Sequence, residues 1–333
     1  MSDTQSQTPS VADRVRPIAT GAPVVAVRFV GDTAAFVLGE EALLLADAAG
    51  ERRVDVHAGG ILATAGDGKR IVSGGDDGKV VATMADGTST QIAKDPKGRW
   101  IDQVALGPDG AVAWSAGKSV FVQSSKGETR SIDVVSSAGG LAFAPKGFRI
   151  AIAHYGGATL WFPNAAAPAE TLDWKGSHLG VTFSPDGKFL VTLMQESMLH
   201  GWRLADRKHM RMSGYAARVR SVDWTADGNW LATGGSDQLI LWPFQAKDGP
   251  MGKNPKMLAP WSTRLVTIAC HPKQDIVACG YINGLVLLVR VADGAEILVR
   301  KPGDAPITAL AFSQTGKQLA FGTEDGQAGI LTL

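Results

Sequence analysis

A unit of about 40 residues recurs along this chain, and that period limits the fold more than any other feature of the sequence. Each copy alternates apolar and polar residues, breaks at a turn that usually contains Gly, and alternates again. A clear copy runs from Val219 to Trp242 as VRSVDWTADGNWLATGGSDQLILW, and a second from Leu179 to Leu193 as LGVTFSPDGKFLVTL. Alternation with a period of two predicts half-buried β-strands, and the intervening turns predict hairpins.

Eight copies of this unit can be placed between Val24 and Leu333. Successive copies are 35 to 46 residues apart, measured between the last core-facing residues of their predicted first strands. These positions are Phe29, Thr64, Leu106, Phe143, Phe183, Trp224, Cys270 and Phe312. A third and a fourth short strand follow in most copies. Four antiparallel strands per copy, repeated at this period, indicate a β-propeller.

We therefore expect an all-β fold, a single β-propeller of four-stranded antiparallel blades. Eight blades is the primary prediction, and seven is the alternative if the weakly patterned first or second copy is irregular. The eighth copy ends after its third strand, which would leave a strand edge unpaired. Residues Asp13–Ala19 lie at the right distance to supply the missing outer strand, so we expect a ring closed by the N-terminal strand. The domain prediction is a disordered polar tail at residues 1–12 and a propeller at residues 13–333.

Charge and composition argue against several classes of protein. The chain has 33 Lys plus Arg and 32 Asp plus Glu, for a net charge of +1. Nucleic-acid-binding domains usually carry a basic excess. No segment reaches about 18 uninterrupted apolar residues, and the N-terminus lacks the apolar region of a signal peptide. We expect no nucleic-acid partner, no membrane partner and a cytoplasmic location.

The segments FSPDGKFL, WTADGNWLATGGSDQLILW and IVSGGDDGKV resemble the strand-turn-strand core of the WD-repeat (WD40) family. The resemblance covers nearly the whole chain from about Val24. A blade of that family ideally carries a structural tetrad of Trp, Ser or Thr, Asp and His. The sixth copy is similar in having Thr233, Asp237 and Trp242, but Tyr215 stands at the His position. No copy contains the Trp-Asp pair, so the resemblance is to a divergent member.

The resemblance implies a non-catalytic scaffold that mediates protein–protein or peptide interactions through one loop face of the propeller. In that family the loop before each first strand and the loop between the second and third strands share this face. Trp, Tyr and Arg dominate interface hot spots because they bury a large area at modest entropic cost. The candidate partner-binding residues in these loops are Arg99, Trp100, Tyr155, Trp174, Tyr215, Arg218, Arg220, Trp261, Arg264 and Tyr281. For each aromatic side chain the alternative is packing between blades.

Local motifs for catalysis or metal binding are weak. No GxSxG nucleophile motif occurs, and the GDGK and SPDGK turns lack phosphate-loop spacing. Cys270 and Cys279 are of a residue type that binds zinc, but both occupy interior positions of the repeat, so we expect core packing. We predict no enzyme activity, no cofactor and no metal. The alternative is a small-ligand or metal binder, or an enzyme, that uses the central channel. The expected partners are one or more unidentified proteins or peptides, and self-association is left open.

An insertion at Gln245–Pro260 lengthens the sixth copy between its third and fourth strands. Its Lys, Gly and Pro residues predict a flexible, solvated loop on the face opposite the candidate site. We interpret it as a tolerated insertion, with a second contact site as the alternative.

Overall fold

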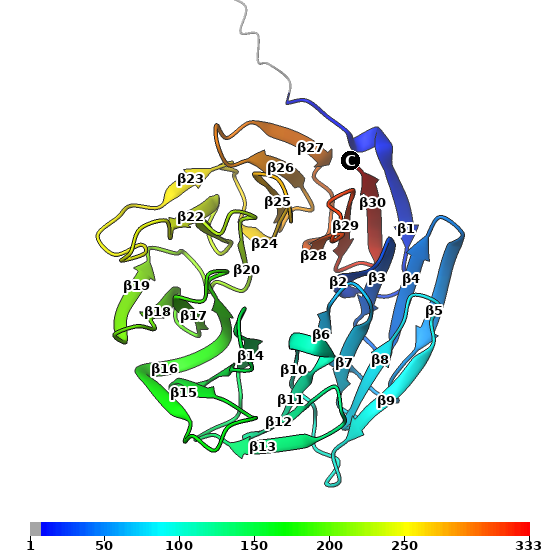
Figure 1. Cartoon of the computed structure of the whole chain (residues 1–333). Helices are drawn as coiled ribbons and strands as arrows, with labels where there is room; N and C mark the ends of the chain where they lie inside the picture. The colour runs from blue at the N-terminus through cyan, green and yellow to red at the C-terminus, as the bar shows by residue number, and fades with distance from the viewer. Residues whose placement is uncertain (1–7) are drawn as a thin grey trace, which may run out of the picture.

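The computed structural model describes residues 8–333, which form thirty β-strands around a central opening (Figure 1). The described residues also contain two short 3-10 helices, η1 (Ala12–Arg14) and η2 (Pro108–Gly110). None of the helices in this part of the chain is long and apolar enough to cross a membrane. Neighbouring strands pair antiparallel, as the Gly-containing turns predict.

Six of the seven sheets have four strands each. One contains β2 (Val24–Val30), β3 (Thr33–Leu38), β4 (Ala42–Asp47) and β5 (Gly50–Asp55). The next contains β6 (Ile61–Gly66), β7 (Ile71–Gly75), β8 (Lys79–Thr83) and β9 (Ser89–Lys94). A third contains β10 (Gln103–Leu106), β11 (Val112–Ala116), β12 (Ser119–Gln123) and β13 (Thr129–Asp133).

The other three four-stranded sheets come from the C-terminal half of the chain. One contains β20 (Val222–Trp224), β21 (Trp230–Thr233), β22 (Leu239–Pro243) and β23 (Lys256–Leu258). The next contains β24 (Leu265–Cys270), β25 (Ile276–Tyr281), β26 (Val286–Arg290) and β27 (Glu296–Arg300). The last combines β28 (Ile307–Phe312), β29 (Gln318–Thr323) and β30 (Gln327–Thr332) with the N-terminal β1 (Val15–Ala19).

The remaining sheet has six strands and contains the fourth and fifth sequence copies together. Its strands are β14 (Gly140–Phe143), β15 (Ile150–Trp161), β16 (Glu170–Phe183), β17 (Phe189–Met194), β18 (Met198–Arg203) and β19 (Lys208–Ser213). β15 and β16 have 12 and 14 residues, and each folds back within its length. His154 Nε2 lies 2.9 Å from Thr159 Oγ1 within β15, and His178 Nε2 lies 3.0 Å from the Trp174 carbonyl oxygen within β16. Such contacts are out of reach in an extended strand, which rises about 3.3 Å per residue.

Counted by hydrogen-bonded sheets, the ring therefore has seven blades, and the prediction of eight separate four-stranded blades was wrong. The alternative of seven blades agrees with this number. The reason given for that alternative, an irregular first or second copy, is not what the structure shows. The first and second copies form ordinary sheets, whereas the fourth and fifth share one because β16 belongs to both. The two halves of this double sheet pack against each other through side chains such as Leu160, Leu172 and Leu190.

The N-terminal strand closes the ring, as predicted. β1 pairs with β30 in the register Val15↔Leu331 to Ala19↔Gln327, and Ile18 is buried against the first sheet. Figure 1 shows the N-terminal strand beside the C-terminal one. Of the predicted tail at residues 1–12, residues 1–7 lie outside the described part. Pro9 and Val11 hydrogen-bond with Leu298 through their backbones, so these two residues of the predicted tail contact β27.

The core lies between neighbouring sheets rather than in one central mass. Each cluster of buried apolar residues combines side chains from two adjacent copies, for example Val72 of β7 with Trp114 of β11. The insertion at Gln245–Pro260 is also partly packed, because Pro250 is buried and Met251 contacts the apolar cluster around Phe189. Asp248 forms an ion pair with Arg203. The insertion is therefore anchored, and the expectation of a free solvated loop was wrong for these residues.

Candidate functional site

The loop face expected from the resemblance exists in the structure. In most sheets the turn between the second and third strands donates a backbone hydrogen bond to the loop that leads into the first strand. Examples are Gly39 N–H to the Pro23 carbonyl at 2.8 Å, Asp76 N–H to the Gly60 carbonyl at 3.0 Å, and Ile282 N–H to the Arg264 carbonyl at 2.9 Å. These bonds hold both kinds of loop at the same end of the strands. The binding role of this face stays a prediction.

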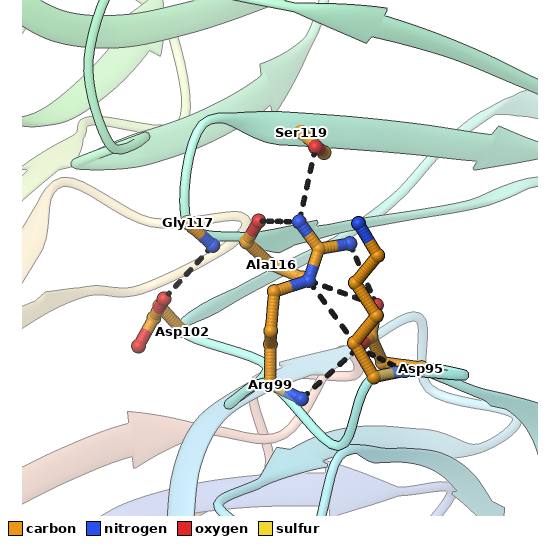
Figure 2. A network of polar contacts seen from close by, with 7 residues as sticks. Asp95, Arg99, Asp102, Ala116, Gly117 and Ser119 are labelled. Atoms are coloured by element: carbon orange, nitrogen blue, oxygen red, sulfur yellow. Dashed lines mark hydrogen bonds and ion pairs between the residues drawn. The ribbon is translucent and has the colours of Figure 1, made fainter.

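Arg99 is a positioning residue on this face (Figure 2). Its guanidinium forms an ion pair with buried Asp95 at 2.7 Å and donates to the Ala116 carbonyl and to Ser119 Oγ, each at 3.2 Å. The hydrogen bond from Arg99 lowers the pKa of Asp95, so the carboxylate is ionised at neutral pH. Arg99 thus ties the loop after β9 to the turn between β11 and β12. Its donors serve the fold, and Trp100 is the large apolar side chain of this loop that is exposed to solvent.

Three loops tied together by hydrogen bonds expose large apolar side chains. Trp100 is 61% exposed, Val135 is 77% exposed and Tyr155 is 65% exposed. Backbone bonds link the turn at residues 117–118 to residues 134 and 138, and Tyr155 N–H donates to Ser136 Oγ at 2.9 Å. We call residues 95–102 and 134–138, together with the irregular part of β15 at residues 154–157, the aromatic loops. The sequence prediction missed Val135, which only its position in a loop before a first strand could have indicated.

Three of the predicted face residues are packed into the fold instead. Tyr281 is fully buried and donates its hydroxyl to the Ala259 carbonyl at 2.6 Å, and Tyr215 is also buried. Trp174 is half-buried and stacks on His200 with ring centroids 4.0 Å apart. The prediction that Tyr215 and Tyr281 contact a partner was therefore wrong. For these residues the alternative of packing between blades is the correct one.

The remaining predicted residues lie around a second part of the face. Trp261 is 37% exposed, and its ring centroid is 6.3 Å from that of Tyr281. Arg218, Arg220 and Arg264 line one cavity of about 460 Å³ between the loops before β20, β24 and β28. Arg218 donates to Gln195 Oε1 at 2.7 Å. We call this space the arginine cavity.

A larger cavity of about 790 Å³ lies at the centre of the ring and is lined by first strands of several sheets. Its charged groups include Arg28 and Asp223. Arg28 donates to the Thr64 carbonyl at 3.0 Å, and Asp223 accepts from Cys270 N–H at 2.7 Å. Burial raises the pKa of Asp223 to about 6. Both charged side chains thus join the first strands of neighbouring sheets.

The tetrad-like residues of the sixth copy form a buried polar network that includes Tyr215. The Tyr215 hydroxyl lies 2.8 Å from Thr233 Oγ1 and accepts a hydrogen bond from Trp242 Nε1 at 2.6 Å. Burial raises the pKa of Tyr215 to about 12, so it is neutral. Asp237 is exposed and accepts from the Ser236 hydroxyl, outside this network. Thr233 and Trp242 are therefore part of this buried network, and Asp237 lies outside it.

A second buried network includes a histidine and was not predicted from the sequence. His57 Nδ1 lies 2.9 Å from Asp77 Oδ1, and His57 Nε2 lies 2.8 Å from Ser73 Oγ. Burial raises the pKa of Asp77, but hydrogen bonds from Ala58 N–H, His57 and Lys79 N–H outweigh it and lower the pKa to about 2. His57 and Ser73 are buried, so the network joins strands and is closed to solvent. The signal was the position of His57 before a first strand.

Cys270 and Cys279 are both buried in the apolar cluster between the sheets of β20–β23 and β24–β27. Burial raises the pKa of each thiol above its usual range. The interpretation as core residues is confirmed. Within residues 8–333, no group of three or more His, Cys, Asp or Glu side chains is arranged to hold a metal ion.

Comparisons with known proteins agree with this architecture. Residues 207–242 match the family model described as "WD domain, G-beta repeat". The guanine nucleotide-binding protein subunit beta of Oryza sativa is 26% identical over 106 residues, which cover 32% of this chain and 26% of that protein. The Protein LST8 homolog of Drosophila melanogaster is 29% identical over 126 residues, covering 37% of this chain and 39% of that protein. The matching stretches thus span well under two thirds of these relatives.

A solved structure matches over almost the whole length. The crystal structure of the computationally designed Ika8 protein superposes with a TM-score of 0.77 at 17% identity. The match covers 95% of this chain and 98% of that chain. At this identity the likeness concerns the fold alone.

Proposed function

We propose that this chain is a WD40-repeat β-propeller that acts as a non-catalytic scaffold and binds a protein or peptide partner through the aromatic loops. The relatives support this proposal in a general way. The rice protein is named as a subunit, which by definition assembles with other chains. The proposal for the present chain depends on its own surface.

The observation that carries the proposal is the exposure of Trp100 and Tyr155 on loops that are fixed by hydrogen bonds. An exposed Trp leaves a large apolar area in water, and covering it contributes about 25 cal/mol per Å². Because Arg99 and Ser136 already hold these loops, a partner loses little free energy in ordering them. Fixed loops with exposed aromatic rings are typical of binding hot spots.

The buried polar networks support a scaffold rather than an enzyme. His57, Ser73 and Asp77 have the order of contacts found in hydrolytic triads, but a substrate would need access to the Ser73 hydroxyl. That hydroxyl belongs to a side chain only 1% exposed. In the central cavity, Arg28 and Asp223 form hydrogen bonds with backbone groups of neighbouring strands. These side chains stabilise the ring.

Capture of the partner from the protein's own cells tests the proposal. We would express the chain at native level, cross-link, purify it and identify companions by mass spectrometry. Changing Trp100 and Tyr155 together to Ala removes both exposed rings and leaves the hydrogen bonds of Arg99 in place. We expect a companion of the unaltered protein to fall at least about tenfold in yield with this variant, since hot-spot aromatic residues contribute 2 kcal/mol or more.

The matched control is Met84→Ala. Met84 is 43% exposed in the turn between β8 and β9, at the opposite end of the strands from the loop face. The Met84→Ala variant should recover the companion in the same yield as the unaltered protein. Equal recovery of every companion with the Trp100/Tyr155 variant, once that variant is shown to melt like the unaltered protein, would contradict the proposal.

A further inference from the structure

The arginine cavity lies on the loop face but outside the aromatic loops. Arg218 and Arg220 come from the segment before β20, and Arg264 comes directly before β24. Glu324, in the turn between β29 and β30, is the acidic residue of the lining. Three arginines and one glutamate thus line a cavity of about 460 Å³.

Two of these guanidinium groups have no protein partner within residues 8–333. No hydrogen bond or ion pair in that range holds the side chain of Arg220 or Arg264, and both residues are exposed. This contrasts with Arg99 and Arg203, whose donors are used by nearby carboxylates. Arg218 is held by Gln195, so it presents its remaining N–H groups from a fixed position. The cavity therefore offers unused, planar donor groups.

We infer that the arginine cavity binds an acidic peptide segment of a protein partner through the Asp or Glu side chains of that segment. Guanidinium and carboxylate groups match in a bidentate geometry, and Arg is suited to that pairing. The cavity walls also include Val266, Ile282 and Pro306, which can pack against the aliphatic part of a peptide.

The lining favours a peptide over a nucleic acid. Single-stranded nucleic acids are bound by basic grooves combined with aromatic side chains that stack on bases. The residues that line this cavity include no aromatic side chain. The net charge of the chain is +1, which gives no broad attraction for a phosphate backbone.

Binding of a labelled octaglutamate peptide tests the inference, with fluorescence anisotropy as the readout. We expect saturable binding to the full chain and none of a matched Gly–Ser peptide. Arg220→Gln and Arg264→Gln should each raise the Kd by about fivefold, the loss of one exposed charge pair, and more when combined. The matched control is Arg130→Gln, which removes the same charge from the exposed outer strand β13. It should leave the Kd unchanged.

Three results would overturn the inference. One is absence of saturable binding by a folded protein. Another is an equal loss of affinity with Arg130→Gln, which would indicate attraction to overall charge. The last is displacement of the peptide by oligothymidylate or by inorganic phosphate at lower concentration than by unlabelled octaglutamate, which would assign the cavity to nucleic acid or to a small anion.

The inference rests on the proposed use of the loop face for protein binding, and its failure can be told apart from failure of that proposal. The Trp100/Tyr155 variant should keep the octaglutamate affinity because its changes lie on other loops. Loss of the cellular companion with that variant, combined with no octaglutamate binding, would leave the proposed function standing and reject the acidic peptide.

Discussion

His200 is a fully buried imidazole with no hydrogen-bond partner for either ring nitrogen within residues 8–333. It stacks on Trp174, and the rings of His178 and His209 lie nearby. Burial, together with the positive charges that His178, His209 and Arg211 can carry, lowers the pKa of His200 to about 3. A buried polar group without a partner costs about 1–3 kcal/mol. His200 is therefore a weak point in the fold.

His200→Leu should raise the free energy of unfolding by about 1 kcal/mol at pH 7, since it replaces an unpaired polar ring with an apolar side chain of similar size. The substitution should also reduce the pH dependence of the free energy of unfolding. The pKa of His200 is about 3 in the folded state and about 6.5 in the unfolded state. Below pH 6.5 the unfolded state therefore binds a proton that the folded state does not. The free energy of unfolding is highest above pH 6.5 and decreases as the pH falls toward 3. Urea unfolding across this range, with Gln91→Leu at an exposed position of β9 as the control, measures both effects. A destabilised His200→Leu protein would contradict this account.

The sequence predicted which aromatic residues stand in or beside the loops better than it predicted whether their rings point to solvent or into the fold. Trp100 and Tyr155 are exposed as expected, whereas Tyr215 and Tyr281 point into the fold. All four stand in or beside loops, and loop position does not decide which way a ring points. That direction depends on the hydroxyl partner in the fold. For Tyr215 this is Thr233, eighteen residues away along the chain.

At the scale of elements, strands and turns followed from the sequence, but their division into sheets did not. The alternating patterns correctly predicted inner strands such as β17 and β28. The sequence copies gave no sign that β16 runs from the outer strand of one copy into the first strand of the next. A sharp bend at Gly176, with φ of 105°, lets the chain continue without leaving the sheet. Such continuity depends on hydrogen bonds between distant segments.

Removal of β1 should weaken the whole ring, because this strand covers the edge of β30 and buries Ile18. A chain that lacks residues 1–19 should lose at least about 3 kcal/mol of unfolding free energy, from one buried aliphatic side chain and several strand hydrogen bonds. The exposed edge should also promote self-association. Adding a synthetic peptide of residues 12–20 should restore the Tm, whereas a scrambled peptide should not. An unchanged Tm after the deletion would show that the ring is not closed by β1.

The whole molecule is a ring whose core is distributed over the contacts between sheets, so each sheet depends on its neighbours. Polar side chains reinforce those contacts at the centre. Ser221 and Asp223 bond to β24, and Thr308 bonds to Val24 across the closure of the ring. A ring built in this way presents loops from separate sheets in fixed positions. This rigidity is what the proposed scaffold requires of its loop face.

The most direct test of the central claim is site-specific photo-cross-linking at that face. A photoreactive amino acid would replace Trp100 in one version of the protein and Met84 in another, and both would be irradiated in the protein's own cells. The account predicts a discrete protein adduct from position 100 and none from position 84. Adducts from position 84 alone, or no adduct from position 100 in a folded and fully labelled protein, would contradict binding through the loop face.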